Sequence, residues 1–340
     1  MTSPVLLNNV SLLGQSTAQN KRLADLRSLM DNLSRQITTG VTVENYAGLG
    51  TNAGPAQNLH AQLPLLKSYQ SNIDTVSNKM TLMNGALGNI TDVGNQLITA
   101  LQTNLQSDPT NVTALRQLAQ QGLSTVQEMM NQHYNGQYLF AGSDYSAPPF
   151  QDANSLNANF ANQAAAFLAS GDSAALLTAV SGFSDASLGL SAALTDSSSV
   201  TTRITDTLNV DYTVKADDAS FQDMLRALTL IANLPLPTGG DVATLNDYHD
   251  VMTEAMTMLQ QGVTGINNTA QTLAGKFSLV QSAQAQNDAD INIVQNQISK
   301  FESADTAAAI TQMQLLQTQL EAAYQVTGLV SKLSLVNFID

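Results

Sequence analysis

The feature that most constrains this chain is a long heptad pattern in its C-terminal third. No proline occurs between Gly239 and Asp340, and apolar residues recur there at alternating spacings of three and four. An average spacing of 3.5 residues is typical of a helix that packs along one side against another helix. The pattern contains Met252, Met256, Leu259, Val263, Ile266, Ala270, Leu273, Phe277, Val280, Gln284, Asn287, Ile291, Val294, Ile298 and Phe301. Its polar members, Gln284 and Asn287, can fix helix register at some cost in stability.

The same spacing continues, more weakly, from Asp305 to Val336. If one helix carried the whole pattern, about 85 residues would form a rod of roughly 125 Å at ~1.5 Å per residue. A rod of that length predicts an elongated molecule, because no compact domain of this size could contain it.

Two N-terminal segments carry the same kind of pattern. Residues 5–39 predict a helix that ends at Thr39-Gly40, where the glycine suits a left-handed cap. Residues 57–134 predict two more helices, separated by a turn at Ser107–Thr110. All these apolar faces need partners. Burial therefore favours pairing 5–39 with about 303–338, and 57–134 with about 245–300.

The middle of the chain has poor periodicity. Two alternating stretches near Val200–Ile204 and 208–214 predict strands, and Asp217-Asp218 can cap a helix over 221–232. A further hairpin is predicted at Asn135-Gly136, followed by a short strand. The fold class expected is mainly α: an elongated antiparallel helical bundle or coiled coil formed by the N- and C-terminal segments, with a small inserted α+β domain. The expected domains are a terminal coiled coil of 1–40 plus 303–340, a helical stalk of 41–150 plus 241–302, and the insert 151–240.

The composition indicates a surface that other subunits cover. Charged residues make up 12% of the chain, against about 25% in ordinary soluble proteins. Solvated coiled coils carry Glu and Lys beside the seam, whereas this chain has Gln, Asn, Ser and Thr there. Such a surface is less costly to remove from water because no ion has to lose its hydration shell. A monomeric bundle of unusual composition is the alternative.

Charge and hydropathy exclude several classes of partner. The net charge is −14 and no basic stripe is present, which argues against nucleic acid. No apolar run approaches ~18 residues, so no membrane insertion is expected. Cysteine is absent, which excludes disulfides and thiolate metal sites. The first residues lack a basic region before an apolar core, so export without a cleaved signal peptide is expected.

No set of residues predicts catalysis. The three histidines, His60, His133 and His249, lie in unrelated segments without metal-ligand spacing. Asp247, with Asp250 and Glu254, is interpreted as helix-start electrostatics rather than as a divalent-ion site. We therefore expect no enzyme activity, no cofactor and no metal.

Four stretches resemble the bacterial flagellin superfamily. Leu23–Gly40 is similar to its N-terminal helix and glycine turn, and Tyr46–Gly50 to the loop that follows in some members. Asn131–Phe150 (NQHYNGQYLFAGSDYSAPPF) resembles a run in the hook-associated protein that joins hook to filament. Phe301–Asp305, with Leu315–Ile339, is similar to the C-terminal signature and apolar tail. The resemblance covers about 1–150 and 245–340. It departs at Val41–Glu44, where the usual acidic dipeptide and basic residues are missing.

This resemblance implies a structural subunit of the extracellular flagellum, exported by a type III route. Its implied partners are copies of itself, the neighbouring hook-associated protein, flagellin, and an export chaperone on the C-terminal helix. The junction between hook and filament is the expected place, and flagellin forming the filament itself is the alternative. An exported adhesin or secretion-needle tip, with a ligand pocket in 151–240, is a more distant alternative.

The expected assembly interface follows from the terminal patterns. Asp305 falls on the C-terminal seam, where it marks either a solvated break or a hydrogen-bonding contact to a neighbouring helix or subunit. The interface residues expected are Leu23, Leu26, Met30, Leu33, Ile37, Glu302, Asp305, Leu315, Val326, Leu329, Leu333 and Val336.

Overall fold

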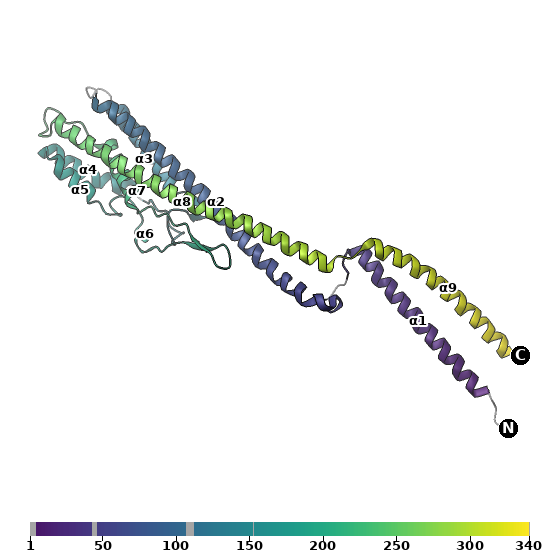
Figure 1. Ribbon diagram of the computed structural model, residues 1–340. Coiled ribbons are helices and arrows are strands. Elements are labelled where there is room, and N and C mark those ends of the chain that lie inside the picture. Colours follow the sequence, from purple (N-terminus) through teal and green to yellow (C-terminus); the bar gives the residue numbers. More distant parts are fainter. Residues whose placement is uncertain (1–4, 43–45, 107–111, 152, 340) are drawn as a thin grey trace. The chain divides into compact units, whose positions relative to one another are not determined.

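The computed structural model describes residues 5–42, 46–106, 112–151 and 153–339. The predicted fold class is confirmed, because the chain is mainly α with long antiparallel helices and short strands (Figure 1). The chain divides into two compact units, Met1–Leu66 with Ala289–Asp340, and Lys67–Asp288. Each is described by itself below.

The first unit contains the terminal helices. α1 (Val5–Thr39) and α9 (Thr306–Ile339) pack against each other, and the 3₁₀ turn η1 (Tyr46–Asn52) follows α1. The unit also includes the beginning of α2 (Ala53–Gln106) and the end of α8 (Leu245–Glu302). α1 ends as predicted, since Gly40 has a φ of 70° and its N–H donates to the Gln36 carbonyl at 2.9 Å.

The second unit is built on the remainder of α2 and α8, with α3 (Val112–Met130) beside them (Figure 1). Its smaller elements are β1 (His133–Tyr134), β2 (Gln137–Tyr138), α4 (Ala153–Ser170), α5 (Ser173–Ser181), α6 (Ala193–Asp196), β3 (Thr201–Arg203), β4 (Asn209–Asp211) and α7 (Ala219–Asn233). β1 pairs with β2 and β3 pairs with β4, both antiparallel. Both hairpins and α7 lie where the sequence predicts them.

The predicted heptad pattern of α8 is confirmed by burial. Each of its members from Met252 to Ile298 is buried or half-buried, whereas their neighbours on the opposite side of the helix are exposed. Asn287 is only 3% exposed although it is polar. The corresponding pattern of α2, from Leu59 to Leu101, is buried in the same way.

α7 lies in the core of the second unit rather than on its surface. Phe221, Met224, Leu225, Leu228 and Ile231 are all completely buried. Their side chains belong to one hydrophobic cluster with those of α2, α3 and α8. Residues 151–240 therefore supply part of the core around which the long helices pack.

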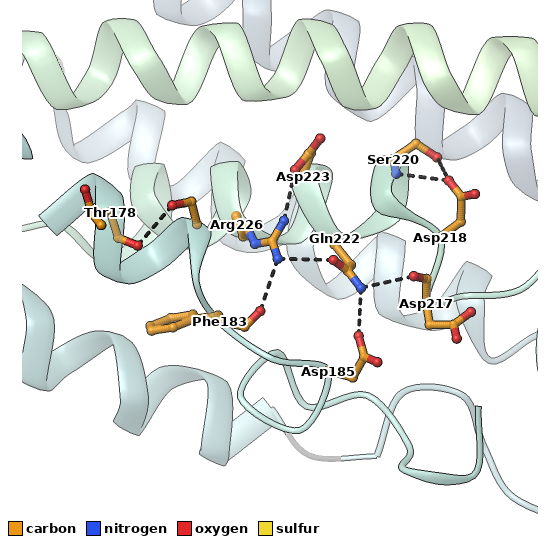
Figure 2. A network of polar contacts seen from close by, with 10 residues as sticks. Thr178, Phe183, Asp185, Asp217, Asp218, Ser220, Gln222, Asp223 and Arg226 are labelled. Carbon is orange, nitrogen blue, oxygen red and sulfur yellow. Dashed lines mark hydrogen bonds and ion pairs between the residues drawn. The ribbon is translucent and has the colours of Figure 1, made fainter. Parts of the chain in front are cut away.

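A polar network attaches α7 to the loop after α5 (Figure 2). The Arg226 guanidinium donates to the Phe183 carbonyl and to the Gln222 side chain, both at 3.1 Å, and pairs with Asp223 at 3.0 Å. The Gln222 amide donates in turn to Asp185 at 2.7 Å. Because these contacts join polar groups within the unit, the network is interpreted as structural.

The C-terminal pattern is not carried by a single helix. α8 ends at Glu302 and α9 begins at Thr306, so the predicted 85-residue rod is wrong. The break also shifts the packed face of α9 by one residue. The buried residues of α9 are Ala309 and Leu316, with Met313 packed against them, whereas the sequence pattern predicts Ala308, Gln312 and Leu315.

The close contact between α7 and α8 gives a stability prediction. A Cβ atom at Gly262 would lie 3.0 Å from the Ser220 carbonyl oxygen and 3.1 Å from the Met224 amide nitrogen. Gly262→Ala should therefore force α7 outward and cost about 1–3 kcal/mol of unfolding free energy. A methyl group at Gly275, on the same helix, would meet no packed atom within 4 Å, so Gly275→Ala should stabilise by ~0.5–1 kcal/mol.

Urea unfolding followed by circular dichroism measures both effects. Opposite shifts of the unfolding midpoint are expected for the two variants. A stabilising Gly262→Ala would contradict the close packing of α7 on α8.

Candidate assembly surface

Two distant stretches of backbone meet in the first unit, at what we call the joint: Gly40–Thr42 and Glu302–Ala304. The Thr42 N–H donates to the Glu302 carbonyl at 2.7 Å, and the Ala304 N–H donates to the Gly40 carbonyl at 2.9 Å. Val41 and Ser303 thereby form an antiparallel β-bridge. The joint connects the end of α1 with the break between α8 and α9.

Side chains reinforce the joint. The Thr42 hydroxyl donates to the Ser303 carbonyl at 3.0 Å, and the Gln36 amide donates to the Thr42 carbonyl at 2.8 Å. The His60 Nε2 atom lies 2.7 Å from the Glu302 carboxylate, and the Tyr46 ring packs edge-on against His60. Glu302, an expected interface residue, therefore makes these contacts within the chain.

Asp305 begins α9. Its carboxylate accepts a hydrogen bond from the Ala308 N–H at 3.0 Å, and its carbonyl accepts one from Ala309 at 2.9 Å. The side chain is exposed. This geometry agrees with a solvated break, because Asp305 is the N-cap of a new helix. A contact of Asp305 with a neighbouring subunit stays a prediction.

The terminal helices contact each other mainly through apolar side chains. Leu33 of α1 is 4% exposed and forms a small buried cluster with Ala309 and Leu316. Arg27 adds a polar contact, since its Nε and Nη2 atoms donate to the Tyr324 hydroxyl at 2.9 and 2.6 Å. Exposed contacts of this kind stabilise by only ~0.5–1 kcal/mol, so the apolar cluster contributes most of the packing.

The expected interface residues of α1 lie on its packed side. Leu33 is buried, and the others are half-buried: Leu23, Leu26, Met30 and Ile37. Leu26, Leu33 and Ile37 pack with a face of α9 that the sequence pattern did not identify, which we call the inner seam: Ala309, Met313 and Leu316. Spacings of four and three from Ala309 onward are visible in the sequence once the helix is known to restart at Thr306.

The expected interface residues of α9 lie elsewhere. Leu315, Val326 and Leu329, here called the outer stripe, are 59%, 49% and 61% exposed. The predicted pairing of 5–39 with about 303–338 is present as the contact between α1 and α9, but the outer stripe does not take part in it. The role of these three residues in assembly stays a prediction. Leu333 and Val336 lie within α9, but their side chains are outside the described residues.

Little in the described part of the chain suggests chemistry. Among those residues no group of His, Asp or Glu has the arrangement of a metal site, and no helix is long and apolar enough for a bilayer. Asp247 accepts hydrogen bonds from the Thr244 N–H and hydroxyl at the start of α8, and these bonds lower the pKa of its carboxyl group. This agrees with its interpretation as a helix-start residue.

The described part of the second unit includes a polar cavity and a buried ammonium group. The cavity, of about 470 Å³, lies between Thr213–Asp218 and α8, but its Lys215 is already paired with Asp217 at 3.1 Å. Burial lowers the pKa of Lys79, whose ammonium group donates to Gln137 at 2.7 Å. Both features have partners within the chain and leave the terminal helices as the strongest candidate surface.

Comparison with known families gives a match in the N-terminal part of the chain. Residues 10–144 match the family model described as the bacterial flagellin N-terminal helical region. This part of the chain is similar to the N-terminal region of bacterial flagellin. The resemblance predicted from the sequence is thus confirmed, and the flagellin-like assignment rests on α1, α2 and α3.

Two solved structures share the fold of this flagellin-like chain. A protein of Vibrio parahaemolyticus assigned as a flagellar hook-associated protein has a TM-score of 0.54 at 8% identity, over 74% of this chain and 97% of that one. FlgL of Bacillus cereus has a TM-score of 0.50 at 12% identity, over 71% and 99%. No curated protein sequence matches the chain.

The capping role of Asp305 can be tested directly. Asp305→Ala removes the acceptor for the Ala308 N–H and should cost about 0.5–2 kcal/mol of local helix stability. Hydrogen exchange of the amides of residues 307–311 should accelerate accordingly. Asp305→Asn, which keeps a capping oxygen, should leave the exchange nearly unchanged. Equal acceleration in both variants would show that the carboxylate charge, not the cap, matters.

Proposed function

We propose that this chain is a self-assembling structural subunit of the bacterial flagellum, located at the junction between hook and filament. It acts outside the cell. Its partners are copies of itself, the neighbouring hook-associated protein and flagellin, with an export chaperone that binds the C-terminal helix. Its role is mechanical, and no catalytic step is involved.

The observation that carries this proposal is the outer stripe. α9 already has an intramolecular partner in α1, yet Leu315, Val326 and Leu329 remain about half exposed or more. Between Thr306 and Ile339 the only charged residues are Glu321 and Lys332. An apolar, nearly uncharged face on an already paired helix is the kind of surface that another protein covers.

The junction is favoured over the filament by the run Asn131–Phe150. The Asn131 side chain makes two hydrogen bonds to the backbone of Phe150, at 2.8 and 2.9 Å, and Phe140 is completely buried. The run is therefore a structural motif that fixes the β1–β2 hairpin on the long helices. Its resemblance to a hook-associated protein, and the fold shared with a structure assigned as a flagellar hook-associated protein, support this choice.

Assembly through the outer stripe gives a prediction. Leu329 is 61% exposed, so Leu329→Asp should leave the isolated chain folded, with an unchanged melting temperature. The same change should abolish incorporation into flagella, because a carboxylate would have to be buried at the subunit contact without a partner. Gln314→Asp, an exposed position of α9 outside the stripe, is the matched control and should assemble normally.

Electron microscopy of flagella from strains carrying these variants provides the measurement, with an antibody raised against residues 151–240. For the unmodified chain, label at the boundary between hook and filament is expected. Label along the filament would select the filament flagellin, and no label on flagella would favour an exported adhesin. Normal assembly of Leu329→Asp would refute the role of the outer stripe.

A further inference from the structure

The seam between α2 and α8 contains a polar layer near the end of the second unit. Asp74 accepts hydrogen bonds from Gln70 at 3.3 Å and from Gln284 at 3.2 Å, and the Asn287 amide donates to Gln70 at 2.9 Å. Polar layers of this kind specify helix register but contribute less to stability than apolar ones. The α2–α8 pair is therefore weakest at this layer, and Lys67 and Asp288, where the unit ends, lie next to it.

The β3–β4 hairpin contacts α2 at the same level. The Asn72 side chain donates to the Arg203 carbonyl at 2.9 Å, across 131 residues of sequence. The Arg203 guanidinium lies over the Tyr69 ring, 5.9 Å from its centroid. Tyr69 is only 6% exposed although it lies beside the seam rather than on it. The hairpin thus covers the flank of α2 at the level of the polar layer.

The hairpin is itself firmly attached to the unit. Its register is fixed by pairing of Thr201 with Asp211 and of Arg203 with Asn209. Ile204 and Val210 are almost completely buried in the main hydrophobic cluster. Arg203 also donates to the Thr205 carbonyl at 3.1 Å and pairs with Asp206, which holds its guanidinium at the tip of the hairpin. A contact to α2 through Arg203 is therefore made by a well-positioned group.

We propose that the β3–β4 hairpin is a brace that holds α2 against α8 at the polar layer. The layer supplies register, and the hairpin adds a contact with the Tyr69 ring that the polar side chains of the layer do not provide. The residues that transmit the support are Arg203 on the hairpin and Tyr69 and Asn72 on α2. The segment 151–240 thus stabilises the helical pair directly, in addition to any role on the outer surface.

Hydrogen exchange of the purified full-length chain tests the brace. In Arg203→Ala the amides of residues 67–76 should exchange roughly tenfold faster. The variant loses the cation–π contact with Tyr69, and the hydrogen bond from Asn72 to the backbone carbonyl of residue 203 is weakened. The amides around Met83–Ile90, farther along the same helix, should not change. Thr207→Ala, an exposed change at the same hairpin tip, is the control and should leave both regions unaffected.

A second variant separates the brace from the integrity of the hairpin. Asn72→Ala removes the donor from α2 and leaves the hairpin sequence intact, so protection of Thr202 and Val210 should persist while residues 67–76 lose theirs. Unchanged exchange of residues 67–76 in both Arg203→Ala and Asn72→Ala would overturn the proposal. This outcome is independent of assembly, because no flagellar partner takes part in the measurement.

Discussion

The first unit depends on hydrogen bonds between backbone segments that are about 260 residues apart. The Thr42 hydroxyl and the Ser303 carbonyl, which meet in the joint, are separated by 261 positions. Closing a flexible loop of that length would cost roughly 5 kcal/mol, plus a constant, in chain entropy. The second unit removes much of this cost. It already brings α2 and α8 together, since Gln70 and Asn287 are in direct hydrogen-bond contact. The joint then has only short connections left to close.

The joint also determines which face of α9 packs against α1 and which face is exposed. Because Ser303 pairs with Val41 in extended conformation, the long C-terminal pattern cannot continue as one helix. Asp305 restarts it with a new phase. The restart places Ala309, Met313 and Leu316 toward α1 and leaves Leu315, Val326 and Leu329 exposed. α9 thereby packs one apolar face against its own chain and leaves a second apolar face exposed. Without the break, the residues of the outer stripe would pack against α1.

Most of the fold could be predicted from the sequence, because long amphipathic helices have apolar residues at regular spacings. The limits of α1, the cap of α7 at Asp218 and the hairpin at Asn135-Gly136 all follow from local residue chemistry. The face of α9 could not be predicted, because a break of three residues resets the phase without interrupting the spacing of apolar residues. The expected interface residues of α1 lie on the packed side, whereas Leu315, Val326 and Leu329 of α9 are exposed. The contact of Arg203 with α2 is also invisible in the sequence, since one side chain and one carbonyl group create no pattern.

The central claim is that the two ends of the chain are joined through Val41 and Ser303. The chain has no cysteine, so the double variant Val41→Cys, Ser303→Cys introduces the only two thiols. Paired residues of an antiparallel bridge lie within the distance that a disulfide spans. Mild oxidation of the dilute monomer should therefore give nearly complete intramolecular cross-linking, measured by mass spectrometry of the peptides. The variant Val41→Cys, Thr311→Cys should not cross-link within the chain. Failure of the first pair to cross-link, or exclusively intermolecular products, would contradict the account.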